Sequence, residues 1–182
     1  MPERIIDCCT LLNLYAGWGG LLELAEFDVS WWISKSVSKE TEYVREYDAT
    51  SGKIITVPLD LEGAVKARLL SIIAADSEQE RLDYVEFATE LDDGEAESLA
   101  LAKNRQLILV TDDQKSLHVA RRPDVNVEPL TTVSVLQEWE KINRTNSKRL
   151  KVVVNRIRDL ARFHPPPGTP DRIWWNTFDD KK

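Results

Sequence analysis

The sequence predicts an α/β fold with a mainly parallel sheet and helices on both of its faces. Short apolar runs alternate with longer amphipathic stretches along the chain, which is the order expected of strand–helix units. With 182 residues, of which 42% are apolar, the chain can bury a core of its own. No apolar run approaches the roughly 20 residues of a membrane span. The start, "MPERIIDCC", also lacks a signal-peptide layout, so we expect a cytoplasmic protein without a membrane partner.

The first half of the chain is expected to contain two buried strands and several helices. A short strand around residues 5–6 leads into Asp7, and "CCTLLNLYAGWGG" predicts the helix that follows. "GLLELAEF" predicts a second short helix and "VSWWIS" a buried strand. From Ser34 or Ser36 the pattern through "VSKETEYVREY" is helical, and "DATSGKIITVPLD" predicts a turn with a flanking strand or an excursion. "LEGAVKARLLSIIAA" has the pattern of an amphipathic helix.

The second half continues the alternation and ends in a different kind of segment. A helix is predicted from Asp92 or Asp93 to about Asn104, followed by the strand "LILVT" and a helix over "DDQKSLHVARR". "VNVEPL" predicts an edge strand and "TVSVLQEWEKI" a helix. One more amphipathic helix and a Pro- and Trp-rich tail follow, where four prolines predict mostly irregular structure that docks through its aromatic residues. We therefore divide the chain into residues 1–143 and a basic extension, residues 144–182.

The charges and the rare residue types limit the chemistry that is possible. Residues 144–162 contain seven Lys or Arg and one Asp, so a net charge of −7 requires a strongly acidic body. This basic arm could hold RNA phosphates or pack on the acidic body. The adjacent Cys8 and Cys9 are expected to be buried thiols, and the two histidines are far apart in sequence, which disfavours a zinc site. Any catalytic chemistry must therefore rest on carboxylates.

Carboxylates follow predicted strands at three places. Asp7 follows "RII", Asp112 and Asp113 follow "LILVT", and "WWIS" leads into a helix that carries Glu40 and Glu42. The carboxyl ends of parallel strands share one edge of a sheet, where ligands collect. Each Asp has a competing explanation as a helix N-cap, and Asp92 and Glu95 have the spacing of a capping box.

Helical geometry separates the two glutamates of "LDDGEAESLALA". At 100° per residue, Glu95 shares a stripe with Leu99 and Ala102, whereas Glu97 points in the opposite direction with Asn104. We therefore expect Glu95 to face inward and Glu97 to face solvent. Several buried acids at one edge would repel one another unless a cation neutralised them, and Mg²⁺ accepts such an arrangement. That pattern favours metal-assisted hydrolysis of a phosphodiester.

Three segments, taken in order, resemble the motifs of PIN-domain proteins. They are "IIDCCTLLNLYA", "ELDDGEAESLALAKNRQLILVTDDQKSLHVA" and "VEPLTTVSVLQEW", and the GEAE segment is similar to that of bacterial VapC-like toxins. The resemblance covers roughly residues 3–140. It implies an α/β/α sandwich, a groove of three or four acids that binds Mg²⁺ or Mn²⁺, and cleavage of single-stranded RNA. The excursion at 47–60 and the arm after about residue 143 exceed a compact family member.

The resemblance assigns roles to individual residues of this chain. Asp7 matches the first acid of the family, Glu95 the acid that opens the GEAE helix, and Asp113 the aspartate of the T-x-D element. Asp112 could supply a further metal ligand or position a water. Glu40 stands at the place of the remaining acid, with Glu42 as its competitor. Two threonines could support the acids through hydroxyl groups, or merely satisfy backbone groups: Thr10 and Thr111.

The leading functional hypothesis is a metal-dependent endoribonuclease that acts as the toxin of a type II toxin–antitoxin pair. Its partners would be an RNA substrate and a cognate antitoxin. The alternatives are a housekeeping RNA-processing nuclease and a non-catalytic PIN module whose acidic groove receives a basic partner segment. A phosphate-accepting receiver or phosphatase is disfavoured, because "DCC" lacks the paired Asp of those proteins. PIN proteins are often dimers, and the Trp pairs at 31–32 and 174–175 are candidate interface residues, with core packing as the alternative for the first.

Overall fold

Five parallel strands form the central sheet of the protein. The structure, a computed structural model, describes residues 2–144 and 147–179. Within these ranges the sheet has the strand order β5-β2-β1-β6-β7, and every neighbouring pair is parallel. The strands are β1 (Glu3–Ile6), β2 (Ser30–Ser34), β5 (Ser71–Ile73), β6 (Ile108–Val110) and β7 (Pro129–Leu130). The predicted parallel α/β sheet is therefore confirmed, with "VNVEPL" contributing its short edge strand.

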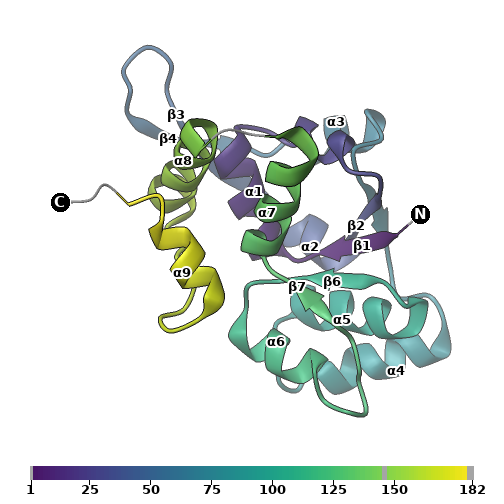
Figure 1. Ribbon diagram of the computed structural model, residues 1–182. Helices are drawn as coiled ribbons and strands as arrows, with labels where there is room; N and C mark the ends of the chain where they lie inside the picture. Colours follow the sequence, from purple (N-terminus) through teal and green to yellow (C-terminus); the bar gives the residue numbers. More distant parts are fainter. Residues whose placement is uncertain (1, 145–146, 180–182) are drawn as a thin grey trace.

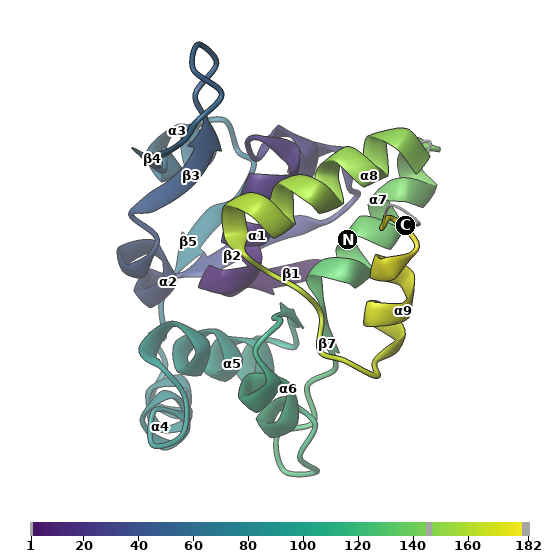
Figure 2. The ribbon, with the colours of Figure 1, turned by 90° about the vertical axis from the view of Figure 1, so that its left-hand side faces the viewer.

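Strand alternation creates two cores, one on each face of the sheet. Ile5 packs with one core cluster and its neighbour Ile6 with the other, as Leu109 and Val110 do in β6. Successive strand side chains point to opposite faces, so a strand buried on both faces reads as a continuous apolar run. Figure 2 shows α1, α7 and α8 on one side of the sheet and α4, α5 and α6 on the other. The fold is thus the expected three-layer α/β/α sandwich.

The helices of the two outer layers begin close to the places that their capping residues indicate. On one side lie α1 (Cys8–Trp18), α7 (Thr132–Asn143) and α8 (Ser147–Arg156); on the other lie α4 (Glu78–Phe87), α5 (Asp93–Arg105) and α6 (Gln114–Ala120). Asp7, Asp113 and Thr131 each accept a backbone N–H of the helix that they precede, and Ser77 forms a full capping box with Glu80. These caps place the starts of α1 and α6 at the carboxyl ends of β1 and β6.

Two predicted helices proved to be shorter helices followed by strands. The pattern after Ser34 gives α2 (Lys35–Glu40) and then β3 (Tyr43–Tyr47), which pairs with β4 (Ile54–Pro58) as an antiparallel hairpin. "LEGAVKARLLSIIAA" gives α3 (Leu61–Lys66), a left-handed turn at Arg68 and then β5. In both cases strand pairing outweighed a helical pattern, within a hairpin for β3 and with the distant strand β2 for β5. The segment "GLLELAEF" forms a 3₁₀ helix, η1 (Leu22–Glu26).

The basic arm packs on the body through its apolar side. In α8 the buried residues are Leu150, Val153 and Val154, and a Cβ on Gly17 of α1 would lie 2.8 Å from Val153 Cγ1. This close approach explains the glycine in the last turn of α1. The arm continues into η2 (Ile157–Ala161), a π-helix, and its residues join the same core cluster as α1 and α7. The core is therefore continuous across the sequence boundary at residue 143.

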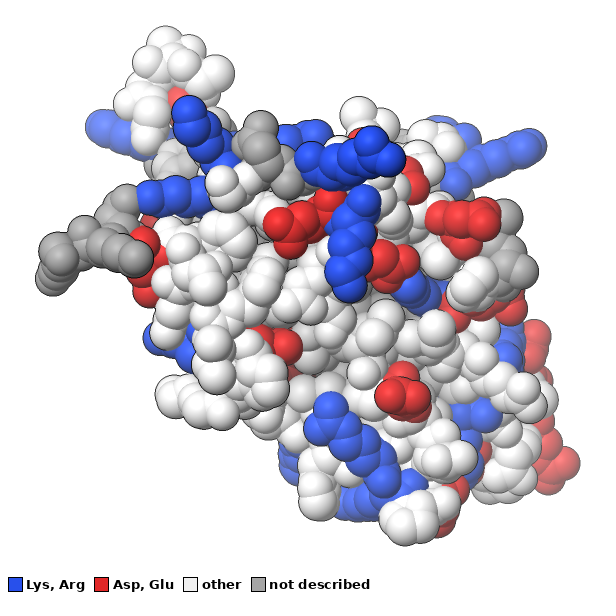
Figure 3. Space-filling view, viewed as in Figure 1, with Lys and Arg blue, Asp and Glu red and all other residues white. Residues whose placement is uncertain are grey.

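The Pro- and Trp-rich tail is more regular than predicted. It contains the helix α9 (Pro170–Asn176), which begins with a proline at its first position and a Thr169 cap. Trp175 is fully buried and packs edge to face on Phe163, so the predicted docking of the aromatic tail is confirmed. Trp31 is likewise a core residue, which bears out core packing for the first Trp pair. In Figure 3, Lys and Arg side chains lie along the upper edge of the view, over the hairpin, α8 and α7.

None of the helices in the described ranges is long and apolar enough to cross a membrane.

Candidate active site

Asp7 ends the central strand and is buried beneath its neighbours. Its carboxylate is 1% exposed; Oδ1 accepts the Thr10 backbone N–H at 2.7 Å and Oδ2 accepts the Thr111 hydroxyl at 2.5 Å. Burial raises the pKa of Asp7 to about 6, although both threonines favour its charged form and lower the value. Asp7 is thus an N-cap and also a buried acid that its surroundings do not neutralise. Thr111 holds Asp7 through its hydroxyl, as expected of a supporting residue, whereas Thr10 holds Asp7 through its backbone N–H and donates its hydroxyl to Asp112 Oδ2 at 3.5 Å.

Asp113 and Asp112 follow β6, but they face different partners. Asp113 caps α6, because its Oδ1 accepts the backbone N–H groups of Lys115 and Ser116, each at 2.8 Å. Asp112 Oδ1 accepts the Thr132 backbone N–H at 3.0 Å. Its Oδ2 accepts the Asn13 amide at 2.9 Å and the Thr132 hydroxyl. Asp112 therefore ties the end of β6 to α1 and α7, and protein donors occupy both of its oxygens.

Glu95 lies in the first turn of α5 and is half-buried. Its carboxylate accepts the backbone N–H of Asp92, whereas the Asp92 side chain makes no cap hydrogen bond, so only half of the predicted capping box forms. Burial, followed by the negative charges of Asp113 and Asp7, raises the pKa of Glu95 to about 7. Capping thus accounts for one hydrogen bond of Glu95, but it does not explain why Asp113 and Asp7 lie near this side chain.

Glu95 is therefore within electrostatic reach of two other predicted acids. Asp7 and Asp113 are the two charges that most strongly raise the pKa of Glu95, and they come from the ends of different strands. Thr111 connects two of them, since its hydroxyl donates to Asp7 and accepts the Asp113 backbone N–H at 3.1 Å. The cluster of Asp7, Glu95 and Asp113 is hereafter called the acidic cluster.

Glu40 and Glu42 lie at the margin of this cluster. Glu40 Oε1 accepts the backbone N–H of Gly94 at 2.9 Å, and a Cβ on Gly94 would come within 2.4 Å of Glu40 Oε2. Burial raises the pKa of Glu40, and the negative charges of Asp93 and Asp92 raise it further, while the hydrogen bond from the Gly94 backbone N–H lowers it. Glu42 is exposed. Of the two competitors, Glu40 is the one that is held against the start of α5.

The expectation that Glu97 faces solvent was wrong. Glu97 is 5% exposed; its Oε2 accepts the Ser36 backbone N–H at 2.7 Å and its Oε1 accepts that of Ala75 at 3.1 Å. The helical wheel assumed one covered face, but α5 packs against α4, α2 and the sheet. Its run of small residues was the available signal, because a helix with alanine on several faces is typical of one that is buried all round. Glu97 anchors α2 and the loop after β5.

Two further features of the site differ from expectation or were not predicted. Cys9 is exposed and Cys8 partly so, whereas both were expected to be buried. Partial burial, and then the charge of Asp7, raise the pKa of Cys9 to about 12, so this thiol is a poor nucleophile. Asn13 and Thr132 hold Asp112 and were missed; a buried polar residue within the apolar helix α1 was the signal for Asn13.

The acidic cluster has the chemistry of a hard-cation site. Within residues 2–144 and 147–179, no group of three or more His, Cys, Asp or Glu side chains lies close enough together, as the side chains stand, to hold a metal ion. Mg²⁺ commonly uses one or two carboxylates and keeps several waters, so an open set of oxygen donors suits it. The raised pKa values of Asp7 and Glu95 show that their negative charges are poorly compensated, which a divalent cation would correct. The donor atoms that Asp7, Glu95 and Asp113 offer are carboxylate oxygens, which is the type of ligand that Mg²⁺ or Mn²⁺ accepts.

Comparison with known proteins identifies one family. A family model described as a PIN domain matches residues 3–173, which includes α8, η2 and part of α9. The match therefore extends well past residue 140, where the sequence resemblance was expected to end. A search of curated proteins finds no match to the chain.

Proposed function

The chain belongs to the PIN-domain family, whose members are generally nucleases, and we propose that it hydrolyses phosphodiester bonds of RNA with Mg²⁺ or Mn²⁺. The observation that carries the proposal is the acidic cluster. The charged side chains that act most strongly on Asp7 and Glu95 are all carboxylates. A buried acid with a purely structural role usually has a basic partner. Because the acids of this cluster have none among the charges that act on them most strongly, a cation bound from solution would stabilise them.

The roles of the acids follow from their electrostatic surroundings and from the elements that their hydrogen bonds connect. Asp7, Glu95 and Asp113 would hold the metal; when bound, it would supply an activated water and stabilise the departing oxygen. Thr111 and the Thr10 backbone N–H hold the carboxylate of Asp7 in one orientation. The first turn of α6 does the same for Asp113 through Oδ1. Asp112 would act as a positioning residue, because its hydrogen bonds fix where β6 ends relative to α1.

A single substitution tests the proposal. Glu95→Gln should lower Mg²⁺- or Mn²⁺-dependent cleavage of a labelled single-stranded RNA by on the order of a hundredfold or more, with no loss of melting temperature in metal-free buffer. Glu78→Gln, at an exposed glutamate of α4, is the matched control and should cleave at the wild-type rate. Intact cleavage in Glu95→Gln, or wild-type protein that binds no Mn²⁺ at millimolar concentration by calorimetry, would overturn it. The latter result would favour a non-catalytic interaction module.

The finer assignment is to a toxin of a toxin–antitoxin pair, and it rests on the similarity of "GEAE" to VapC-like toxins. Expression of the wild-type chain should then arrest growth, while Glu95→Gln should not. Co-expression of a small protein from the adjacent reading frame should relieve the arrest. Growth that is unaffected by the active chain would instead favour a housekeeping RNA-processing nuclease.

A further inference from the structure

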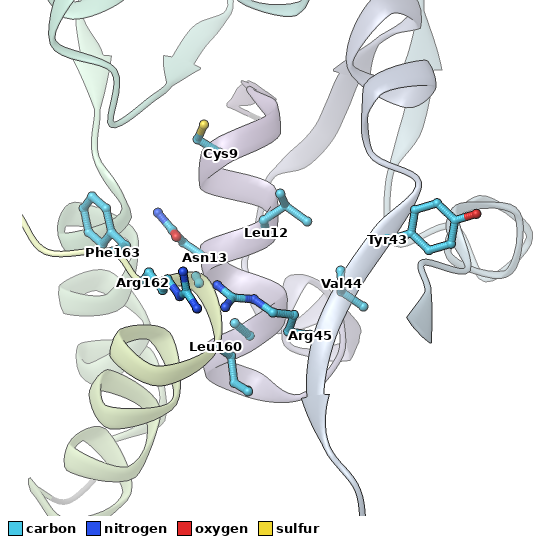
Figure 4. Close-up of a pocket in the computed structure, with 11 residues that line it drawn as sticks. Cys9, Leu12, Asn13, Tyr43, Val44, Arg45, Leu160, Arg162 and Phe163 are labelled. Carbon is cyan, nitrogen blue, oxygen red and sulfur yellow. The ribbon is translucent and has the colours of Figure 1, made fainter. Parts of the chain in front are cut away.

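A pocket of about 280 Å³ lies between α1, the hairpin strand β3 and the end of η2. Its lining includes Cys9 and Asn13 of α1, Arg45 of β3, and Arg162 and Phe163 of the arm. Figure 4 shows the two arginine side chains reaching into the pocket from opposite walls, with Asn13 above them. Segments that are far apart in the sequence thus place two cations in one small space.

The two arginines differ from most others in the protein. Arg4, Arg105 and Arg158 each form an ion pair with a carboxylate, at N···O distances of 2.5 to 3.0 Å. The side chains of Arg45 and Arg162 make no hydrogen bond or ion pair with any residue of the described chain. Like charges that share a pocket repel each other, so an anion bound between them would be stabilised.

The pocket adjoins the acidic cluster. Cys9 lines it, and the charges of Asp7, Glu95 and Asp112 all act on the Cys9 thiol. Asn13 also lines it and donates its amide to Asp112. Asp7 precedes the first turn of α1, so Asn13 lies about 9 Å further along the helix axis. A few nucleotides of an extended strand would cover this distance.

The ends of the pocket are built by unusual backbone. The π-helix η2 contacts both α1 and β3, and the chain leaves it through Arg162 in a left-handed conformation with φ of 57°. Single π-helical turns are frequent at functional sites, because they redirect the side chains that follow. Here the redirected residues are Arg162 and Phe163, which both line the pocket.

We propose that Arg45 and Arg162 form a phosphate subsite for a single-stranded RNA that is cut at the acidic cluster, so this inference rests on the proposed function. Guanidinium groups bind phosphate oxygens in a bidentate manner, and the Phe163 ring offers an apolar surface to a neighbouring base. In this proposal the pocket, of about 280 Å³, takes a single phosphate of the strand. Repulsion by the carboxylates and attraction by the arginines would together set where the strand lies.

The test measures RNA binding separately from cleavage. Fluorescence anisotropy of a labelled oligouridylate with full-length protein in EDTA gives affinity, and a salt titration gives the number of phosphate contacts. Arg45→Gln and Arg162→Gln should each weaken binding by about tenfold. Each should reduce the slope of log affinity against log salt by about 0.7. Arg68→Gln is the matched control. Arg68 is exposed, precedes the amino end of β5 and lines a different pocket from Arg45 and Arg162.

Three further readouts decide between the outcomes. In the presence of metal, the arginine variants should raise KM by more than they lower kcat, and Arg45→Lys should recover part of the affinity, which a merely structural role would not predict. The subsite is overturned if a variant with both Arg45→Gln and Arg162→Gln keeps the affinity and the salt slope of wild type. The subsite is also overturned if Arg68→Gln loses as much RNA affinity as the variants of Arg45 and Arg162. A third contrary result is that the Arg45 and Arg162 variants bind poly-L-glutamate more weakly than wild type does but bind RNA equally well.

The subsite and the nuclease activity can fail independently. Wild-type cleavage with no effect of the arginine variants on binding or KM would refute the subsite and leave the nuclease in place. Arginine-dependent RNA binding by a wild-type chain that cleaves nothing would refute the nuclease and support the subsite.

Discussion

The two ends of α5 hold buried acids in opposite electrostatic surroundings. At its C-terminal end, Arg105 binds Glu80 through two nitrogens, with the Nε–Oε1 distance at 2.6 Å, and Lys103 lies 3.0 Å from Asp83. Hydrogen bonding to Arg105 holds the pKa of Glu80 far below its usual range. At the N-terminal end, burial and neighbouring carboxylates raise the pKa of Glu95 to about 7.

This difference separates structural acids from acids that await a ligand. Glu80 and Asp83 are 4% and 2% exposed, so their burial is as complete as that of Asp7, yet each has a cation from the same protein. A buried charge is tolerated when it is paired and hydrogen-bonded, and costly when it is not. Burial alone therefore does not mark a functional acid; burial without a basic partner does.

The largest expected loss of stability comes from removing Arg105, the cation that compensates Glu80. Arg105→Ala should destabilise the fold by about 3 kcal/mol, because it leaves Glu80 buried and unpaired. Denaturant unfolding at pH 7 measures this. The folded pKa of Glu80 is depressed, so its contribution is present above its ordinary value of 4.5 and is lost as the pH falls below it. The difference between variant and wild type should therefore shrink in acid.

Arg122→Ala is the control for that experiment. Arg122 pairs with Glu90 at 2.7 Å, but about a third or more of each side chain is exposed, so the loss of this pair should cost far less stability than the loss of Arg105. Equal losses in the two variants would break the comparison between buried and exposed pairs.

An intermediate effect is expected at Glu97, two residues beyond Glu95. Glu97→Gln replaces an oxygen that accepts a backbone N–H with an amide that cannot, so unfolding should become easier by about 2 kcal/mol. RNA affinity, measured by anisotropy in EDTA, should stay at the wild-type value. A neutral effect on stability, with impaired RNA binding, would mean that Glu97 belongs to the ligand site instead.

The smallest expected change in stability is at Glu95, where the substitution should stabilise the protein and not destabilise it. Its folded pKa is raised, so the stability that the protonated form contributes is lost as the pH rises from 4.5 toward about 7. In EDTA at pH 8, Glu95→Gln should stabilise the protein by about 1 kcal/mol, a value reduced because the side chain is half exposed. At pH 4.5 or below the two proteins should melt together.

At pH 8, added metal should make wild type more stable than Glu95→Gln, the reverse of the order expected in EDTA. Added Mg²⁺ should raise the melting temperature of wild type and leave that of Glu95→Gln nearly unchanged, because binding to the folded state stabilises it. Calorimetric melting curves at both pH values, with and without MgCl₂, give the comparison. A Glu95→Gln variant that melts below wild type in EDTA at pH 8 would place Glu95 with the structural acids.

Much of this protein was predictable from local sequence. The alternation of strands and helices predicted the parallel sheet, and the pattern strand–Asp–helix placed Asp7 and Asp113 at its carboxyl edge. These predictions succeeded because they depend on short-range rules: side-chain alternation in strands, and caps that join an Asp to the next helix. The same rules predicted the start of α5 beside Glu95.

The errors at β3, β5 and Glu97 share one physical cause. The helical patterns over β3 and β5 were overruled by pairing with β4 and β2, and Glu97 was buried by neighbours on a second side of α5. Local periodicity carries no information about which distant segment will cover a face.

The sequence by itself determined which acids reach the carboxyl edge of the sheet, because that placement follows from each strand and the helix after it. Only the tertiary structure decided which of them would be compensated. Arg105 meets Glu80 from 25 residues away. Thr132, at the start of α7 beyond the neighbouring strand β7, meets Asp112 from 20 residues away. No basic side chain is among the main charges that act on the acidic cluster in the described chain. Charge compensation depends on distances of a few ångströms between segments far apart in sequence, and only folding sets those distances.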